Sequence, residues 1–376
     1  MQNKFILNFR RFDTILLVAM SLLILLGLLV LYSSGLRPGP TATQLDTSRQ
    51  AIYVVVGMLV FWVLARTDYN VLKNYSTALY VLMIASLLVV EIFGATRLGA
   101  TRWINLGFFQ FQPSEFAKLI LIIVLAKFFA GCYEQSDKIK YLFISLLYLL
   151  PPLVLVMAQP DLGTGMVLTV IWLVMALSSR IKKRYFVVML LLALLIIPIA
   201  IPRLAPYQQQ RIKTFLNPTA DPASSGYNVN QAIIAVGSGG IFGQGLSSGS
   251  QSQGNFLPSQ HTDFVFAVLS EKMGFLGAIV CIFLYCVIIF RALWIAKYSA
   301  NRFGSFLAIG IASMFGFHVV VNIGMNIGLL PVTGIPLPFI SAGGTSMIIS
   351  IISIAMLESI YARRRTVNIN TKEVYE

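Results

Sequence analysis

Several ionisable side chains lie inside or at the edges of apolar stretches of this 376-residue chain. The acidic ones are Glu91, Glu115, Asp161, Asp263 and Glu271, and the basic ones are Lys118 and Lys272. A charged group in a membrane-like environment costs several kcal/mol unless it is paired or hydrated. Charges kept at such a cost indicate a polar cavity, an ion pair or a catalytic site.

Asp263 is the candidate for proton-transfer chemistry. It stands in His261-Thr262-Asp263-Phe264, where a long polar segment meets an apolar run. A carboxylate there could take a proton from a hydroxyl group as a general base, or it could merely cap the following helix. Glu271 lies eight residues further on, about 12 Å deeper at 1.5 Å per residue. Two acids leading inward predict a polar cavity, unless Glu271 pairs with a neighbouring helix.

A second group of charges predicts a structural ion pair. Glu115 and Lys118 are three residues apart and would share one face of a helix. Asp161 begins another apolar run, in Gln159-Pro160-Asp161-Leu162-Gly163. It is expected either to cap that helix or to neutralise Lys118 near the outer membrane face.

The composition decides which kind of fold carries these residues. Hydrophobic residues make up 57% of the chain and charged residues 11%, with a mean hydropathy of +0.80. A soluble domain is nearer 45–50% apolar and 25% charged. The composition therefore excludes a soluble enzyme, a disordered chain and a single-span anchor.

Ten apolar runs are long enough to cross a bilayer, and closed backbone hydrogen bonding makes each a helix. They cover residues 14–33, 49–65, 75–94, 113–131, 141–158, 162–179, 185–201, 263–290, 303–327 and 344–361. Pro151, Pro152 and Pro198 are expected to bend or break the shorter spans. We expect an all-α integral membrane protein, a single polytopic domain over residues 1–376 with about ten transmembrane helices.

The net charge of +14 comes from lysines and arginines whose positions indicate how the chain is oriented in the membrane. With both termini in the cytoplasm, nineteen of the 28 lysines and arginines fall on the inner side and seven on the outer side. This bias is typical of a multi-pass protein of the cytoplasmic membrane. The inner loops share the charge, so no compact basic patch for nucleic acid is predicted.

Residues 202–262 form a large extracytoplasmic loop between the seventh and eighth expected helices. Within it, residues 230–236 are apolar enough for a short helix at the membrane surface. Glycines recur in its second half: Gly237, Gly239, Gly240, Gly243, Gly245, Gly249 and Gly254. Such a stretch could bring backbone close to a sugar or phosphate, or it could be a flexible surface loop.

The last apolar runs hold further polar features. Residues 334–346 contain two prolines and three glycines and cannot form a regular helix. Non-helical backbone at membrane depth is tolerated only against protein or a water-filled cavity, so we expect a re-entrant loop lining the site. His318, Asn322 and Asn326 are expected to form hydrogen bonds between helices rather than to catalyse.

Four stretches carry a resemblance to a known family. They are residues 111–118 (FQPSEFAK), 159–165 (QPDLGTG), 257–264 (LPSQHTDF) and 336–346 (PLPFISAGGTS). In this order they resemble the SEDS proteins, the shape, elongation, division and sporulation family of bacteria. The segment 215–222 (FLNPTADP) and the segment 248–253 (SGSQSQ) are more similar to the elongation member than to the division member.

The resemblance implies a peptidoglycan glycosyltransferase with ten transmembrane helices. Its substrate would be lipid II, an undecaprenyl-diphosphate-linked disaccharide peptide, polymerised at the outer face of the cytoplasmic membrane. Its partner would be a class B penicillin-binding protein. The family's essential aspartate corresponds to Asp263, and its membrane lysine and Gln-Pro-Asp aspartate correspond to Lys118 and Asp161. The chain departs from the family pattern at Ala342, in place of an aromatic residue, and at Lys272, in place of a second acid.

The chemistry of that reaction assigns roles to the charges. An α-linked donor that gives a β-linked product reacts with inversion in one displacement, which needs a base such as Asp263. A diphosphate leaves readily, so a cation can replace the acid of an inverting hydrolase. Candidates for substrate binding are Arg102, Lys118, Arg211, Lys213 and Glu271, with a divalent ion such as Mg²⁺ or Mn²⁺ as a further possibility.

Two other functions fit the same sequence. A lipid II flippase would explain the charges within the membrane and the broken segment near Pro336. A non-catalytic scaffold for cell-wall synthases would need none of the charges for chemistry. Against the flippase, the candidate residues gather at the outer end without a matching polar path at the inner end.

Overall fold

The computed structural model describes residues 12–34, 42–93, 95–97, 100–105, 110–135, 138–200, 208–209, 211, 214–215, 225–254, 256–257 and 259–364. Within these ranges the long helices are α1 (Thr14–Ser34), α2 (Ala42–Arg66), α3 (Asn70–Phe93), α4 (Pro113–Cys132), α5 (Ile139–Ala158), α6 (Leu162–Leu177), α7 (Lys183–Ala200), α11 (Val265–Tyr298), α12 (Arg302–Asn326) and α13 (Gly344–Ala362). The predicted all-α membrane fold is confirmed.

The shorter elements lie between these helices. They are the strands β1 (Ala95–Arg97), β2 (Ala100–Asn105) and β3 (Gln110–Phe111), the turn η2 (Tyr133–Gln135), and the helices α9 (Ser225–Ser238) and α10 (Ser250–Gln253). The strands form one antiparallel sheet in the order β1-β2-β3. Helix α9 contains the short helix that we predicted at residues 230–236.

The number of membrane crossings agrees approximately with the prediction. Eight helices in the described part of the chain are long and apolar enough to span a membrane. The other two predicted spans correspond to α6, which has 16 residues, and to α7. Pro151, Pro152 and Pro198, which we expected to bend or break their helices, do not end them: α5 continues through the first two and α7 continues past the third.

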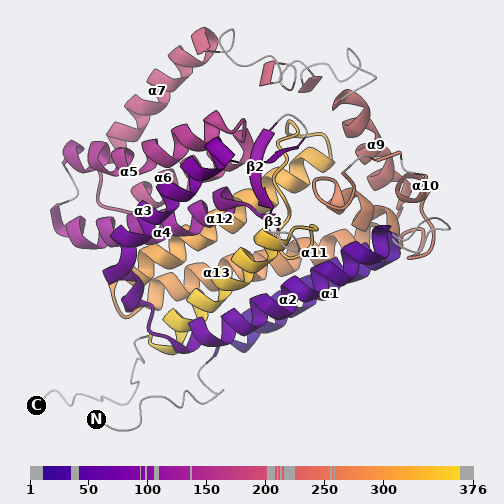
Figure 1. The fold of residues 1–376 in the computed structure, drawn as a ribbon, viewed down its shortest axis with the longest axis horizontal. Coiled ribbons are helices and arrows are strands. Elements are labelled where there is room, and N and C mark those ends of the chain that lie inside the picture. Colours follow the sequence, from indigo (N-terminus) through magenta and orange to yellow (C-terminus); the bar gives the residue numbers. More distant parts are fainter. Residues whose placement is uncertain are drawn as a thin grey trace, which may run out of the picture.

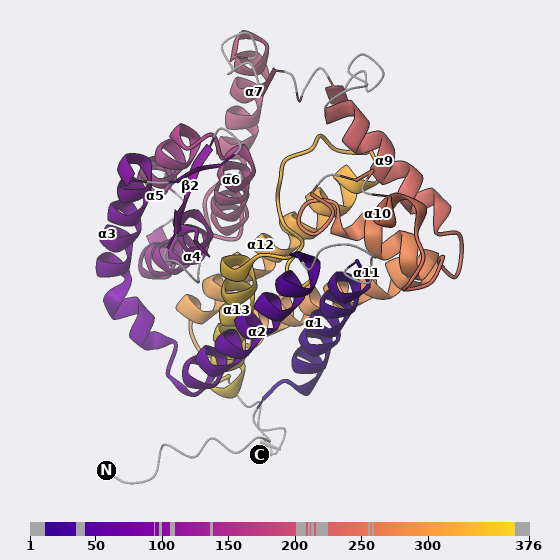
Figure 2. The ribbon, with the colours of Figure 1, turned by 45° about the vertical axis from the view of Figure 1, so that its right-hand side comes forward.

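Helices α4, α12 and α13 form the centre of the bundle, with α1, α2, α3, α5 and α6 around them, while α7 projects away (Figures 1 and 2). The central helices are the most buried of the candidate spans. On the outer helices, large apolar side chains such as Ile15, Val55 and Leu195 are exposed. Apolar residues exposed at this density are suited to lipid rather than to water.

The beginning of α1 and the end of α13 meet at one end of the bundle. The Asp13 N–H donates to the Glu358 Oε2 at 2.8 Å, and the Arg291 Nε donates to the Asp13 Oδ2 at 2.6 Å. Asp13 and Glu358 are buried, so the arginine compensates charge that would otherwise be costly. The chain therefore enters and leaves the bundle on the same side.

Helix α11 is interrupted at Gly274, which has φ 68° and ψ −166°. The interruption frees backbone groups, and residues 239–253, here called the clasp segment, pair with them. The N–H groups of Phe275 and Leu276 donate to the carbonyls of Gly240 and Ile241 at 2.9 and 3.2 Å. In return, the carbonyls of Glu271 and Lys272 accept from the clasp segment, from Gln244 N–H at 2.9 Å and Gly245 N–H at 3.1 Å.

These four hydrogen bonds show what the glycine-rich stretch contacts, which the sequence left open between a sugar or phosphate ligand and a flexible surface loop. Unpaired backbone groups at the edge of a membrane would cost several kcal/mol each. The glycines of the clasp segment let two backbones approach at the break in α11. The clasp segment is therefore a structural element held against α11.

Candidate functional site

Asp263 precedes α11 in a tight turn over residues 259–264. The N–H groups of Thr262, Asp263 and Phe264 all donate to the Ser259 carbonyl, at 3.1, 3.1 and 3.3 Å. The N-cap residue of α11 is Phe264, the residue after Asp263. Asp263 is partly exposed, whereas Phe264 and Val265 after it are buried.

Two asparagines of α12 hold the main chain of Asp263. Asn322 Nδ2 and Asn326 Nδ2 donate to the Asp263 carbonyl at 3.1 and 3.0 Å. Asn326 Oδ1 also accepts the Ala267 N–H at 3.0 Å in the first turn of α11. The sequence predicted that these asparagines form hydrogen bonds between helices, but it did not indicate that they bind the main-chain carbonyl of Asp263.

Residues 331–343, between α12 and α13, are non-helical, which confirms most of the predicted segment 334–346, but residues 344–346 already belong to α13. It lies directly beside Asp263: a Cβ placed on Gly334 would stand 3.7 Å from the Asp263 Oδ2. Two bonds join this segment to the turn that carries Asp263. Ala342 N–H donates to the His261 carbonyl at 2.7 Å, and Ser341 Oγ donates to the Thr262 carbonyl at 2.6 Å.

Side chains from the surrounding helices satisfy the backbone of this segment. Tyr285 on α11 donates to the Pro338 carbonyl, and Gln50 on α2 donates to the Ser341 carbonyl at 3.1 Å. Gln50 Oε1 accepts the Gly343 N–H at 3.2 Å. Sequence reasoning missed Gln50, although a buried glutamine in an apolar run was a signal that could have found it.

Lys118 lies in the interior of the bundle with two partners. Its Nζ is 2.7 Å from Glu115 Oε1 on the same helix and 3.2 Å from His318 Nε2 on α12. The other nitrogen of His318, Nδ1, is 2.9 Å from the Pro336 carbonyl. A carbonyl only accepts, so Nδ1 carries the hydrogen and Nε2 accepts from the ammonium group. The ion pair of Lys118 with Glu115 forms as the spacing predicts.

Asp161 takes the capping role rather than the pairing role. It is the N-cap of α6, where Oδ1 accepts the Thr164 N–H at 3.2 Å and Oδ2 accepts the Thr164 hydroxyl at 2.9 Å. Ser114 Oγ of α4 also donates to Oδ2, at 3.4 Å. The carboxylate that neutralises Lys118 is Glu115. The three-residue spacing on one helix brings Glu115 to the lysine, while the orphan N–H groups at the start of α6 attract Asp161.

The Glu271 side chain, which we expected to bind substrate, contacts the clasp segment. Glu271 is fully buried, and its two oxygens accept backbone N–H groups at the start of α10. Gln251 N–H donates to Oε1 at 2.7 Å and Ser252 N–H donates to Oε2 at 3.0 Å. A carboxylate beside the first N–H groups of a helix satisfies them and stabilises the positive end of the helix dipole. Glu271 therefore fastens the clasp segment.

Lys272 explains one departure from the family pattern. Its Nζ donates to the carbonyls of Leu246 and Ser248 at 3.1 and 3.3 Å. These are again groups of the clasp segment, and Lys272 is buried like Glu271. The two neighbouring charges thus bind the N–H and the carbonyl groups of the same loop.

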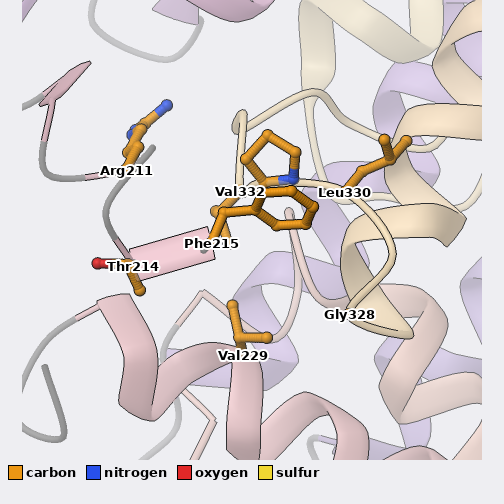
Figure 3. Close-up of a pocket in the computed structure, with 8 residues that line it drawn as sticks. Arg211, Thr214, Phe215, Val229, Gly328, Leu330 and Val332 are labelled. Carbon is orange, nitrogen blue, oxygen red and sulfur yellow. The ribbon is translucent and has the colours of Figure 1, made fainter. Parts of the chain in front are cut away.

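Of the four cations predicted to bind substrate, the structure describes the side chains of two, Arg211 and Lys118. Lys213 and the side chain of Arg102 lie outside the described residues, although the backbone of Arg102 is in β2. Arg211 borders a small pocket. Figure 3 shows Arg211 and Thr214 on one side of this pocket and Gly328 and Leu330 on the other. Lys118 is buried and contacts Glu115 and His318.

A metal ion would have few protein ligands in this site. In the part of the chain that the structure describes, no group of three or more His, Cys, Asp or Glu side chains could hold a metal ion. Mg²⁺ is commonly bound by one or two carboxylates together with substrate phosphates and water. Asp263 would be the carboxylate of this chain that fits such an arrangement.

We expect Lys118→Met to destabilise the bundle strongly. The change leaves Glu115 buried beside an apolar group and removes the donor to His318, and breaking a buried pair costs about 3–5 kcal/mol. The midpoint of thermal unfolding in detergent should fall by many degrees. Arg180→Met is the control, because Arg180 pairs with Glu134 with both side chains exposed, and such a pair contributes about 0–1 kcal/mol. Equal midpoints for the two variants would contradict the prediction.

Comparison with known proteins identifies the family. The model of the FtsW/RodA/SpoVE family, described as cell cycle protein, matches residues 13–366. The peptidoglycan glycosyltransferase MrdB of Escherichia coli K12 is 36% identical over 353 residues, 94% of each chain. A chain solved in a peptidoglycan synthase complex superimposes with a TM-score of 0.79 and 29% identity, covering 93% of this chain and 97% of the other.

The crystal structure of the rod shape determining protein RodA of Thermus thermophilus is similar as well. It gives a TM-score of 0.71 at 27% identity and covers 94% of this chain and 98% of the other. These matches extend over nearly the whole bundle and confirm the resemblance that the four sequence motifs indicated. The chain belongs to the FtsW/RodA/SpoVE family of multi-pass bacterial membrane proteins and is a peptidoglycan glycosyltransferase.

Proposed function

We propose that the chain polymerises lipid II into β-1,4-linked glycan strands during cell elongation, with Asp263 as the general base. The observation that carries this assignment is the difference among four of the five acids singled out in the sequence; the fifth, Glu91, is exposed near the end of α3. Glu115, Asp161 and Glu271 are buried and bind Lys118, the start of α6 and the start of α10. Asp263 is partly exposed, and its main chain is held by side chains of a second helix.

The reaction needs one proton acceptor at the attacking oxygen. The 4-hydroxyl of the acceptor sugar attacks the anomeric carbon of the donor as its proton passes to the Asp263 carboxylate. The bond from that carbon to the undecaprenyl diphosphate breaks, and the diphosphate leaves with the electron pair. One displacement inverts the configuration, so an α-linked donor gives a β-linked product. A positioned base of this kind contributes about 10²–10⁴ to the rate.

The length of α11 supports a site at the level of the lipid headgroups. The part of α11 after its break at Gly274, residues 275–298, would extend about 36 Å, enough to cross a hydrocarbon core of about 30 Å. Arg291 and Lys297 mark its inner end, so the break at Gly274 lies near the outer boundary of the hydrocarbon. Asp263 then lies outside the hydrocarbon, where the diphosphate and sugars of a lipid-linked substrate are found.

Arg211 is the described cation best suited to the diphosphate. It borders a pocket that also contains apolar side chains, including Phe215, Val229 and Leu330. A guanidinium group matches phosphate oxygens in a bidentate geometry, and the apolar wall is compatible with the isoprenoid chain. Arg102 and Lys213 remain candidates from the sequence, as does a divalent cation.

The orientation and the partner belong to the same proposal. The excess of lysine and arginine on one side favours both termini in the cytoplasm, and the contact of Asp13 with Glu358 is consistent with an even number of crossings. A class B penicillin-binding protein is the proposed partner, supported by the similar chain from a peptidoglycan synthase complex. Membrane lipid surrounds the bundle, and no nucleic acid is involved.

One assay tests the activity against the two alternatives. The purified chain, with its penicillin-binding partner, is supplied with labelled lipid II, and long products are digested with a β-1,4-specific muramidase. A glycosyltransferase gives digestible chains, whereas a scaffold gives none. Proteoliposomes with labelled lipid II in one leaflet measure flipping in parallel. Flipping without polymerisation would reject the proposal in favour of the flippase.

A further inference from the structure

Three polar side chains form a line along α12. His318, Asn322 and Asn326 are spaced by four residues, so they lie on one face of the helix. All three are buried, with exposures of 3%, 0% and 0%. Polar groups buried in an apolar helix are retained when each finds hydrogen-bond partners, and here the partners are backbone carbonyls of two other segments.

The line joins the non-helical segment to the turn of Asp263. His318 Nδ1 is 2.9 Å from the Pro336 carbonyl, and Asn322 Nδ2 donates to the Ile335 carbonyl at 2.8 Å. The same Asn322 amide donates to the Asp263 carbonyl, as Asn326 does. One helix face therefore sets the distance between the two backbones that border the Asp263 carboxylate.

We propose that His318, Asn322 and Asn326 are positioning residues, which hold the main chain of Asp263 in register with residues 331–343. This inference rests on Asp263 being the general base. A base must stand within hydrogen-bond reach of the hydroxyl that it deprotonates, and a displacement of about 1 Å can cost about 10²-fold in rate.

The orientations of the Asn326 amide and the His318 ring are each determined by a second contact. Asn326 Oδ1 accepts the Ala267 N–H, so its Nδ2 must point toward the Asp263 carbonyl. His318 Nε2 accepts from Lys118, so its Nδ1 hydrogen must point toward Pro336. Lys118 and Glu115 thereby act on the site through the His318 tautomer, without contact to Asp263.

Two substitutions of His318 separate its two contacts. Asparagine places its amide nitrogen where Nδ1 stands and can still donate to Pro336, whereas glutamine reaches toward Lys118 from the position of Nε2. We expect His318→Asn to keep kcat within about threefold and His318→Gln to lower it at least about tenfold, because the Pro336 bond carries the positioning. A merely structural role would affect both variants alike.

The asparagines are tested with an isosteric change. Asn326→Asp keeps an oxygen for the Ala267 N–H but loses the donor to the Asp263 carbonyl, and Asn322→Ala loses both of its donors. We expect both variants to lower kcat for lipid II polymerisation by about 10–100-fold, with the KM changed by less than about twofold. Ser353→Ala is the control, because buried Ser353 bonds only to Ile349 of its own helix.

The measurements are kcat and KM of the purified chain with its partner, together with the thermal midpoint of each variant. Wild-type kcat in Asn326→Asp and in Asn322→Ala, or equal kcat in the two His318 variants, would overturn the inference. If Asn322→Ala does not fold, Asn326→Asp and the His318 pair decide the result. Asp263→Asn is run alongside: an inactive Asp263→Asn with active asparagine variants rejects only the positioning, whereas an active Asp263→Asn rejects the base itself.

Discussion

We expect Asp263→Asn to lower the rate of lipid II polymerisation by about 10²–10⁴, the contribution of a positioned general base. The carboxamide has the shape of the carboxylate but cannot accept the proton of the acceptor hydroxyl. The fold should be unaffected, since Asn322 and Asn326 bind the main-chain carbonyl and not the side chain. The rate is measured with purified lipid II and with the partner bound.

The matched control is Asp68→Asn. Asp68 lies between α2 and α3 with its side chain half exposed, and it contacts Asn70 and Arg363. The same chemical change there should leave the rate within about twofold of wild type, as for most surface substitutions. Glycan chains formed at wild-type rate by Asp263→Asn would show that another group, or the substrate itself, takes the proton.

The second large effect is expected from the glycines where the clasp segment meets α11. At Gly243 a Cβ would overlap the Lys272 carbonyl and stand 2.7 Å from the Gly274 nitrogen, and φ is +83°. At Gly274 a Cβ would stand 2.5 Å from the Ile241 carbonyl oxygen, with φ +68°. The obstacles are backbone atoms in both cases, so no side chain can move aside. Gly243→Ala and Gly274→Ala should each lose about 3 kcal/mol or more and abolish activity.

Gly237→Ala provides the comparison for these variants. Gly237 lies in α9, and a Cβ there would meet no atom within 4 Å. Gly237 is the last but one residue of α9, where the preference for alanine over glycine is at most the value of about 0.5–1 kcal/mol in a helix interior, so this variant should be about as stable as the wild type. Thermal unfolding in detergent measures all three. Wild-type midpoints for Gly243→Ala and Gly274→Ala would mean that the clasp segment can leave α11 without cost.

The helices could be predicted from the sequence because their cause is local. An apolar run of about 20 residues has to close its own hydrogen bonds in a bilayer, and the resulting boundaries of α1, α4 and α13 agree with the structure within two residues. The non-helical stretch near Pro336 was predicted for the same reason, since proline and glycine act on the backbone where they stand.

The partners of the charged residues depend on contacts that a single sequence does not reveal. Glu271 was assigned to a cavity because it follows Asp263 by two helical turns, but a glycine three residues later breaks the helix and brings α10 to it. Asp161 could be predicted only as one of two alternatives. The hydrogen bonds of Asn322 and Asn326 to the Asp263 carbonyl connect residues about 60 positions apart. The sequence indicated them only through the presence of two amide side chains in an apolar run.

The interruption of α11 has a consequence for the order in which the chain is assembled. The clasp segment lies within about 40 residues of its partners Phe275 and Leu276, so it can close once the outer half of α11 has emerged during synthesis. The groups that fix Asp263 come later, on α12 and in residues 331–343. In a nascent chain that ends after α11, the clasp segment could therefore be bound to α11 while the main chain of Asp263 still lacks its partners on α12. With Asp263 as the proposed base, a chain that ends after α11 is therefore expected to lack glycosyltransferase activity.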